Sequence, residues 1–253
     1  MDDTCSGLSL KQRGGPGVST LRGLTPLALR APSGHYEGVI HSYPLFDLAV
    51  RTPKLELRAA TDELLEQIVP FVAAGIFDPG QPPPFDDPMS LYDDSPSREW
   101  RWRRAIWAGR ARVEPDEWWR LYFVVVVDGE PVGMQDLIGI QFRELRTATT
   151  FSWIGRPHQG RGFGTEMRRA ILHLGFAGLG AERLQSEAFD DNVASNAISR
   201  GLGYTPNGTA WATRQGKPAR LLRWELTRDR WQPSRRDDIE LFGIDRSLAV
   251  LGI

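Results

Sequence analysis

The stretch from residue 151 to residue 170 constrains the fold most, because an apolar strand pattern enters a glycine-rich turn there and a helix pattern leaves it. The turn reads Gln-Gly-Arg-Gly-Phe-Gly over residues 159–164. Glycines at alternate positions let the backbone curl tightly and approach a ligand, since no Cβ stands in the way. The helix pattern over 165–178 puts the unpaired N–H groups of the turn at a helix N-terminus, where a phosphate is favoured. We therefore predict a strand–turn–helix unit that binds an anion.

Two other phosphate-binding patterns do not fit this turn. A P-loop requires Gly-Lys-Ser or Gly-Lys-Thr after its glycines, and neither follows here. The dinucleotide fingerprint requires its third glycine where the sequence has Thr165, and the flanking hairpin patterns argue against a parallel nucleotide-binding sheet. The pattern that remains is Q-x-x-G-x-G.

Length, charge and cysteine content narrow the class of protein. A chain of 253 residues can bury a full core, and one domain with added arms is the simplest partition. The formal net charge of -1 argues against a general nucleic-acid binder or a basic membrane protein. The single cysteine, Cys5, predicts a reducing, cytoplasmic setting. We expect no signal peptide, and the apolar run at 121–127 is too short to span a membrane.

The periodicity of the chain predicts alternating strands and helices after an irregular leader at residues 1–45, in which a short extended piece is conceivable at 36–40. Asp128-Gly129 is the strongest short hairpin signal. Trp118, Trp119, Trp153, Trp211 and Trp224 are first of all expected to be core residues. Strands are predicted at 54–58, 121–127, 131–134, 146–154, 182–189, 211–213 and 219–226, and helices at 61–75, 98–112, 114–119, 165–178 and 192–202.

Residues 78–112 form an unusual arm. A loop is predicted over 78–97, where the proline triplet at 82–84 cannot continue a helix or a central strand. The helix predicted over 98–112 mixes tryptophans with six arginines and lacks a clean apolar face. One interpretation is a helix with an arginine-rich solvated face. The other is an arm that recognises an acidic substrate or the phosphates of a large ligand.

Together with the turn, three further segments resemble the GNAT acyltransferase superfamily, in particular the branch that acetylates the N-termini of ribosomal proteins. They are Arg-Thr-Pro-Lys-Leu-Glu-Leu at 51–57, the N-x-x-S pair Asn192 and Ser195, and Leu-Gly-Tyr at 202–204. The resemblance implies an α+β fold of three layers, α/β/α, with a mixed, mostly antiparallel sheet that splays between its fourth and fifth strands, 146–154 and 182–189. It also implies a GNAT domain over 46–228 with the arm inserted at 78–112, followed by a C-terminal extension at 229–253.

The resemblance further implies that acetyl-CoA, or another acyl-CoA, lies in the splayed opening as a co-substrate. Backbone N–H groups of residues 161–164 would hold its pyrophosphate, and an amide near Ile154 would polarise the thioester carbonyl. No cluster of His, Cys, Asp and Glu has metal-ligand spacing, so no metal is expected. The implied donor-binding residues are Trp153, Ile154, Gln159, Gly160, Arg161, Gly162, Phe163, Gly164, Thr165, Asn192 and Ser195.

Transfer to an amine also requires a base and a proton for the departing thiolate. Glu187 occupies the strand position that holds a base carboxylate in several superfamily members, and desolvation there would raise its pKa toward a useful range. The alternative is that Glu187 points outward as an ordinary strand residue. Ser199 stands where many members have a tyrosine, and an unperturbed serine is a poor proton donor. In the branch that this chain resembles, Ser195 is the better candidate for the general acid. His158, beside the turn, is expected to be a loop residue facing solvent.

These observations favour an N-acyltransferase that moves an acetyl group from acetyl-CoA to a primary amine, either a protein N-terminus or a small molecule. The alternative is an acyl-CoA-binding module of low activity that engages a partner through the arm at 78–112. RNA recognition by that arm would show a steep dependence on salt. No membrane partner is expected, and the apolar tail leaves homodimerisation open.

Overall fold

The computed structural model describes residues 42–85 and 95–253. The predicted leader up to residue 41, with Cys5 and the extended piece at 36–40, lies outside the described residues, as do residues 86–94 of the arm. The described part begins with a short 3-10 helix, η1, over Pro44–Asp47.

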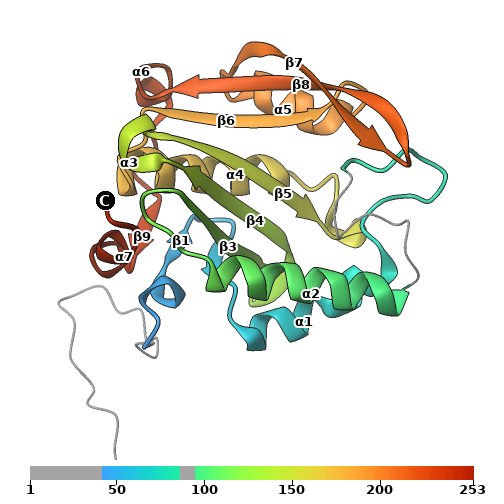
Figure 1. Ribbon diagram of the computed structural model, residues 1–253, viewed down its shortest axis with the longest axis horizontal. Helices are drawn as coiled ribbons and strands as arrows, with labels where there is room; N and C mark the ends of the chain where they lie inside the picture. The colour runs from blue at the N-terminus through green and yellow to red at the C-terminus, as the bar shows by residue number, and fades with distance from the viewer. Residues whose placement is uncertain (1–41, 86–94) are drawn as a thin grey trace, which may run out of the picture. The chain divides into compact units, whose positions relative to one another are not determined.

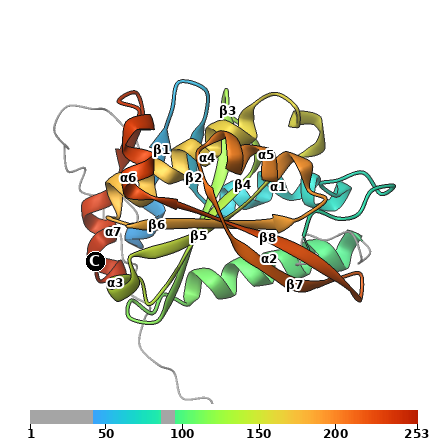
Figure 2. The same ribbon diagram turned by 90° about the horizontal axis from the view of Figure 1, so that it is seen from above.

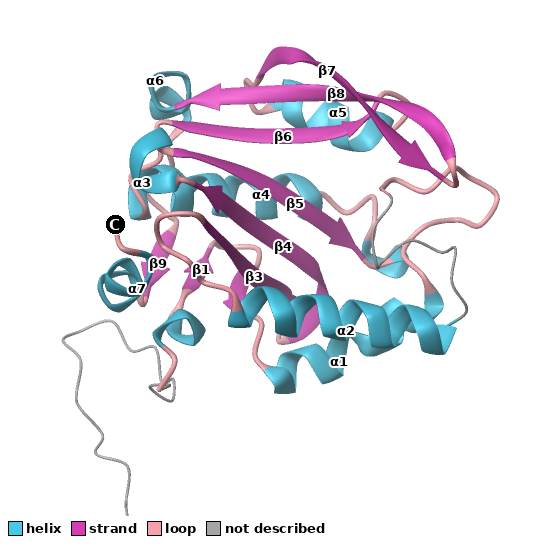
Figure 3. Ribbon diagram, viewed as in Figure 1, coloured by secondary structure: helices cyan, strands magenta, loops and turns pink. Residues whose placement is uncertain are grey.

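A single sheet of nine strands organises the described residues (Figures 1 and 3). Its order is β7-β8-β6-β5-β4-β3-β2-β1-β9, and β5 with β6 is the only parallel pair among these neighbours. The predicted mixed, mostly antiparallel sheet is therefore confirmed. The strands are β1 (Ala49–Arg51), β2 (Glu56–Ala59), β3 (Trp118–Val127), β4 (Glu130–Ile140), β5 (Thr147–Ile154), β6 (Arg183–Phe189), β7 (Thr205–Arg214), β8 (Lys217–Thr227) and β9 (Glu240–Phe242).

Helices cover both faces of the sheet and bury the central strands between them (Figure 2). Alternate residues of a strand point to opposite faces, and β3 supplies both cores. Leu121, Phe123 and Val125 belong to the cluster that includes α4, whereas Tyr122 and Val124 belong to the cluster that includes α1 and α2. This two-sided burial explains why the sequence of β3 is apolar without interruption from Leu121 to Val127.

The helices begin and end at signals that are legible in the sequence. Thr61 caps α1 with its side chain, and Gly75, at φ 79°, follows the last residue of that helix. Asn192 caps α5 in the same way. The helices are α1 (Asp62–Ala74), α2 (Ser95–Ala111), α3 (Phe142–Leu145), α4 (Phe163–His173), α5 (Val193–Gly201), α6 (Arg228–Trp231) and α7 (Ile244–Leu251), with a π-helical turn, Leu174–Gly178, directly after α4 and a 3-10 turn, Gln232–Ser234, after α6.

The parallel pair β5–β6 opens along its length, which we call the splay. Pairing runs from Thr147 with Arg183 to Thr150 with Ser186 and stops there. Beyond that point β5 stays paired with β4 as far as Ile154, and β6 stays paired with β8 as far as Phe189. The two strands therefore diverge from a closed end at Thr150 and Ser186, as the resemblance implies.

Two expectations from the sequence are wrong. Residues 114–119 do not form a helix: Glu114 and Trp118 bridge across a turn, and β3 begins at Trp118 because that residue already pairs with Ile140. The strand predicted to start at 131–134 is confirmed and continues to Ile140. Trp211 is 72% exposed on the edge strand β7, where no further strand or helix covers it among the described residues. Trp119, Trp153 and Trp224 are buried as expected, and Trp118 is half-buried.

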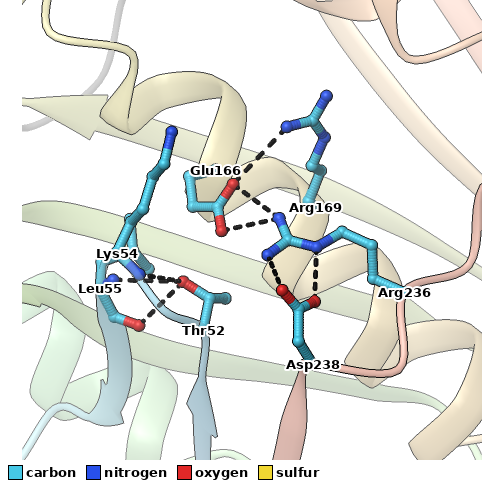
Figure 4. A network of polar contacts seen from close by, with 7 residues as sticks. All are labelled: Thr52, Lys54, Leu55, Glu166, Arg169, Arg236 and Asp238. Atoms are coloured by element: carbon cyan, nitrogen blue, oxygen red, sulfur yellow. Dashed lines mark hydrogen bonds and ion pairs between the residues drawn. The ribbon is translucent and has the colours of Figure 1, made fainter.

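The C-terminal tail joins the sheet. β9 pairs antiparallel with β1, from Ala49 with Phe242 to Arg51 with Glu240. Figure 4 shows how the tail is tied to α4: Arg236 donates to both oxygens of the buried Glu166 at 2.8 and 2.9 Å. The same guanidinium donates to Asp238 and holds the pKa of that exposed carboxyl below its usual range. No described helix is long and apolar enough to cross a membrane.

Candidate functional site

The glycine-rich turn leaves the end of β5 and enters α4 at the open end of the splay. Gly160 and Gly162 have φ of 74° and 83°, a left-handed conformation that side chains with a Cβ rarely adopt. A Cβ added to either would meet nothing within 4 Å, so the space above both is open. Gly162 is the N-cap of α4 and offers that helix no side-chain cap. The first N–H groups of α4 therefore face a space that an anion can fill.

Gln159 anchors this turn. Its side-chain amide donates to the carbonyl oxygens of Ile76 and Ile154, both at 2.8 Å. It thereby ties the turn to the segment after α1 and to the last residue of β5. The sequence predicts that Gln159 belongs to the residues that bind acyl-CoA. In the structure its side chain anchors the turn.

The backbone of β5 beyond the closed end presents its polar groups to the splay. Gly155 donates its backbone N–H to the carbonyl oxygen of Val132, at the position where β4 and β5 exchange hydrogen bonds. Because these positions alternate in an antiparallel pair, the N–H groups of Ser152 and Ile154 point away from β4, toward β6. β6 does not pair with them. The amide expected near Ile154 is therefore directed into the splay.

Helix α5 lies beside the first turn of α4. A Cβ added to Gly164 would lie 3.1 Å from Cδ1 of Ile198. Ser195 is half-buried one turn earlier on α5, and its backbone N–H donates to Oδ1 of Asn192 at 3.1 Å. The fold thus brings the N-x-x-S pair and the glycine-rich turn to the same face of the sheet.

Ser199 lies deeper than the sequence suggests. It is 1% exposed, and its hydroxyl has no hydrogen-bond partner among the described residues. One turn away, Asn196 accepts from the indole N–H of Trp224 at 2.9 Å and donates to the carbonyl oxygen of Phe189. This side of α5 is packed into the core.

Glu187 lies on the opposite face of the sheet. Its neighbours Ser186 and Ala188 are buried, while the Glu187 side chain is 47% exposed with Oε2 at 3.6 Å from Nε of Arg223. The outward orientation is therefore correct, and the burial expected around this carboxylate is absent. The carboxylate borders a hollow of about 270 Å³ next to the closed end of the splay. This hollow is lined by Thr149, Gln185, Ser186, Glu187, Asn207, Arg223 and Trp224.

A second acid on this face was missed in the sequence. Asp136 of β4 is 3% exposed and pairs across the sheet with Phe151 of β5. Its Oδ2 accepts from Nε and Nη2 of Arg120 at 3.0 and 2.6 Å, while Oδ1 has no partner among the described residues. Burial raises the pKa of Asp136 to about 6, and the Arg120 charge opposes that rise. The only local signal is an acid among the mostly apolar residues 131–140.

The arginines of the arm mainly build the pair of α1 and α2. Arg103 forms a bidentate pair with Glu66, and Arg98 donates to the carbonyl oxygens of Val72 and Ala73 at the end of α1. On the inner side Trp102 and Ile106 are buried. These contacts favour the interpretation of the arm as a packed helix with a charged outer face, although Trp100 and Trp107 are exposed on it.

Two further contacts define the surroundings of the splay. The ring of Phe85 packs edge-to-face on Phe151 at 4.9 Å, which places the arm beside the strand that borders the splay. His158 is half-buried and packs edge-to-face on Phe71 at 5.5 Å, so it does not simply face solvent. Within residues 42–85 and 95–253, no group of three His, Cys, Asp or Glu side chains could hold a metal ion.

Comparison with known proteins gives a family and a set of similar folds. Residues 54–205 match the family described as an acetyltransferase (GNAT) domain. The structure resembles Mycobacterium smegmatis RimJ in complex with CoA-disulfide, with a TM-score of 0.62 at 18% identity, over 81% of this chain and 94% of the other. RimL in complex with coenzyme A, named as an alpha-N-protein acetyltransferase, gives a TM-score of 0.50 at 18% identity, over 70% and 95%. A GCN5-related N-acetyltransferase from Brucella melitensis gives 0.57 at 16% identity, over 73% and 80%. At these identities the likeness concerns the fold.

Proposed function

This chain belongs to the acetyltransferase (GNAT) family, and we propose that it transfers an acetyl group from acetyl-CoA to a primary amine. The observation that carries this proposal is the sequence of features along the splay: an open anion site at its wide end, unpaired strand amides along it, and a polar hollow beside its closed end. An elongated donor with a phosphate at one end and a reactive carbonyl at the other suits this order.

The residues present fit such a donor. The left-handed glycines Gly160 and Gly162 leave space above the N-terminus of α4, and Arg161 is exposed beside it with its guanidinium 5.0 Å from the ring centre of Phe163. Helix dipole and cation both favour a pyrophosphate. When bound, acetyl-CoA supplies the activated acyl group. The N–H groups of Ser152 and Ile154 would orient its pantetheine arm and carbonyl along β5.

The acceptor amine would approach from the opposite face, through the hollow. Glu187 lies there at the surface, within reach of water, and can accept the proton that the amine must lose. Arg223 lies beside it, with its Nε 3.6 Å from Oε2 of Glu187. The acceptor class we propose is a primary amine, either a protein N-terminus, as for RimL, an alpha-N-protein acetyltransferase, or a small molecule. We also expect the protein to act in the cytoplasm.

The test is release of the CoA thiol from acetyl-CoA across a panel of amines, with peptides that carry a free N-terminus, the same peptides N-acetylated, and small primary amines. We expect turnover with at least one free amine and none with its acetylated form, together with a mass gain of one acetyl group on the acceptor. CoA binding by calorimetry without turnover on any amine would instead support an acyl-CoA-binding module.

The same assay run on Glu187→Gln separates the proposed base from the binding site. The variant keeps the size of the side chain and loses the proton acceptor, so turnover should fall by about 100-fold while CoA affinity is unchanged. Glu56→Gln is the matched control, because Glu56 is also a strand glutamate paired with an arginine, Arg51, and lies on β2. Equal turnover in all three proteins would show that another group takes the proton.

A further inference from the structure

A buried arginine without a counter-charge lies under the closed end of the splay. Arg168 of α4 is 4% exposed, and its Nη1 donates to Oγ of Ser186 at 2.9 Å. Its Nε has no partner in the described part of the chain, and no carboxylate there forms an ion pair with it. Buried charges are normally paired, because removing an ion from water without compensation is costly. This guanidinium is therefore placed where a negative charge would be stabilised.

The position of Arg168 follows from how α4 runs along β6. A Cβ added to Gly175 would lie 2.7 Å from Leu184, and Arg168, two turns earlier, contacts Ser186. Continuing toward the N-terminus of α4 leads to Gly162, about 9 Å from Arg168 at the rise of a helix. The guanidinium thus lies beneath the closed end, whereas the glycine-rich turn lies at the open end.

Arg168 is the buried charged group next to Ser186 on this face, and the guanidinium of Arg200 lies 5.3 Å from the ring centre of Trp224, the strand partner of Ser186 on β8. Tyr204, between α5 and β7, is buried; burial raises the pKa of its phenol, and Arg168 opposes that rise. Thr150, the strand partner of Ser186, donates its hydroxyl to the carbonyl oxygen of Gln185. The charged groups next to Ser186 on the other face are Glu187 and Arg223.

The hydroxyl of Ser186 is prepared to act as a donor. A serine hydroxyl has one hydrogen and two lone pairs, and Arg168 already occupies one of the lone pairs. The bond from a cation polarises the O–H group and favours an anion as its acceptor. Ser186 belongs to the last pair of the closed end and also borders the hollow. An acyl-CoA bound along the splay would bring its sulfur to this closed end.

We propose that Ser186 donates a hydrogen bond to the departing sulfur of the acyl donor, and that Arg168 is the positioning residue that orients and polarises it. In the transfer, the amine nitrogen forms a bond to the carbonyl carbon and the carbon–sulfur bond breaks. The electron pair of that bond goes to sulfur, which Ser186 stabilises. The proton lost by the amine, accepted by Glu187 or water, balances the thiolate. This inference rests on the proposed function.

The alternation of β6 supports this division of tasks. Ser186 and Glu187 are consecutive, so their side chains point to opposite faces of the sheet. Ser186 contacts α4, and Glu187 borders the open hollow with Arg223. An attacking amine and a leaving sulfur also occupy different sides of the reacting carbon. One strand can therefore serve both ends of the reaction.

The test is a titration of the thiol of bound CoA, followed by the ultraviolet absorbance of the thiolate. In the wild-type protein the thiol pKa should lie about one unit below that of free CoA, because a polarised donor and a cation favour the charged form. Ser186→Ala and Arg168→Met should remove most of that shift, and Arg168→Lys, which keeps the charge, should retain part of it. Ser247→Ala, an equally buried serine on α7, is the matched control and should behave as wild type.

The outcomes separate this inference from the proposed function. Calorimetry of CoA with the wild-type protein comes first: no binding would overturn both. Binding with the same thiol titration in wild type and Ser186→Ala would overturn the inference alone. A shift removed by Ser199→Ala but not by Ser186→Ala would place the sulfur against α5 instead. Because Ser186→Ala deletes one oxygen only, it keeps the test decisive if Arg168→Met fails to fold.

Discussion

At the scale of single residues, Asp136 is a deeply buried carboxyl on the face of the sheet that also carries Glu187. Its carboxyl is almost completely buried on β4, and Arg120 serves only one of its oxygens. The guanidinium of Arg120 also lies over the rings of Tyr122 and Phe151, at 4.9 and 5.4 Å. These contacts hold the arginine in place, so the carboxylate is compensated in part. The burial cost that remains should appear as a dependence of stability on pH.

The predicted change is a loss of stability with rising pH that Asp136→Asn abolishes. The folded pKa of Asp136 is about 6 and its ordinary value is 3.8, so the fold binds the proton more strongly than the unfolded chain does. The favourable contribution is then complete below pH 4 and is lost as the pH rises through about 6. The difference in free energy of unfolding between the variant and the wild type should therefore grow by about 2 kcal/mol from pH 4 to pH 7.

Urea unfolding of both proteins across this range measures that difference, and groups common to both cancel. A difference that stays constant with pH would contradict the assigned shift. The sequence offered only a weak signal for Asp136, since one acid within VGMQDLIGI reads equally well as a residue on an exposed face. Its burial comes from tertiary packing: Phe151 of β5 is its strand partner, and Phe85 of the arm packs on that ring.

At the scale of elements, the features that can be predicted from the sequence are those whose signals lie within a few adjacent residues. The cap of α1, the hairpin between β3 and β4, and the glycine-rich turn each depend on a few adjacent residues. The pairing of β9 with β1 joins residues 240–242 to 49–51 and leaves no local signal. The turn at Glu114 has acidic and tryptophan residues that suit a helix equally well, and the strand ladder from Trp118 decides against it.

The bond between the tail and α4 gives a prediction at this scale. Arg236→Met would leave the buried carboxylate of Glu166 without its main partner, with Arg169 at 3.6 Å as the remaining cation. We expect a loss of about 3 kcal/mol in the free energy of unfolding, because an uncompensated buried charge is strongly destabilising. The double variant Glu166→Met with Arg236→Met should recover much of that loss.

Thermal and urea unfolding of the single and double variants measure this coupling. Asp238→Asn is the control: Asp238 contacts the same guanidinium but is exposed, so its loss should change stability far less than Arg236→Met does. Strictly additive effects of the two substitutions would show that the tail is not held to α4 through this pair.

At the scale of the whole molecule, the order of the motifs along the chain can be predicted from the sequence. Which side chains meet on each face of the sheet cannot. The Q-x-x-G-x-G turn, the segment at 51–57, the N-x-x-S pair and Leu-Gly-Tyr at 202–204 suffice for a family resemblance, and with it the splay. The assignment of Ser199 to the reaction relied on that resemblance alone. The structure buries Ser199 and brings Ser186 and Arg168 to the closed end instead, a juxtaposition of β6 and α4 that only packing creates.

The most direct test of the account is calorimetry of CoA with the wild-type protein, Gly162→Glu and Gly129→Glu. Gly162 lies at the N-terminus of α4 and Gly129 in the hairpin between β3 and β4; their φ values are 83° and 85°, and an added Cβ meets nothing within 4 Å at either. The two substitutions therefore carry equal backbone strain, and only the first puts a negative charge where the pyrophosphate would bind. We predict that Gly162→Glu weakens CoA binding by about 100-fold or more, about 3 kcal/mol, while Gly129→Glu binds CoA as the wild type does. Equal affinity of all three proteins for CoA would contradict the account.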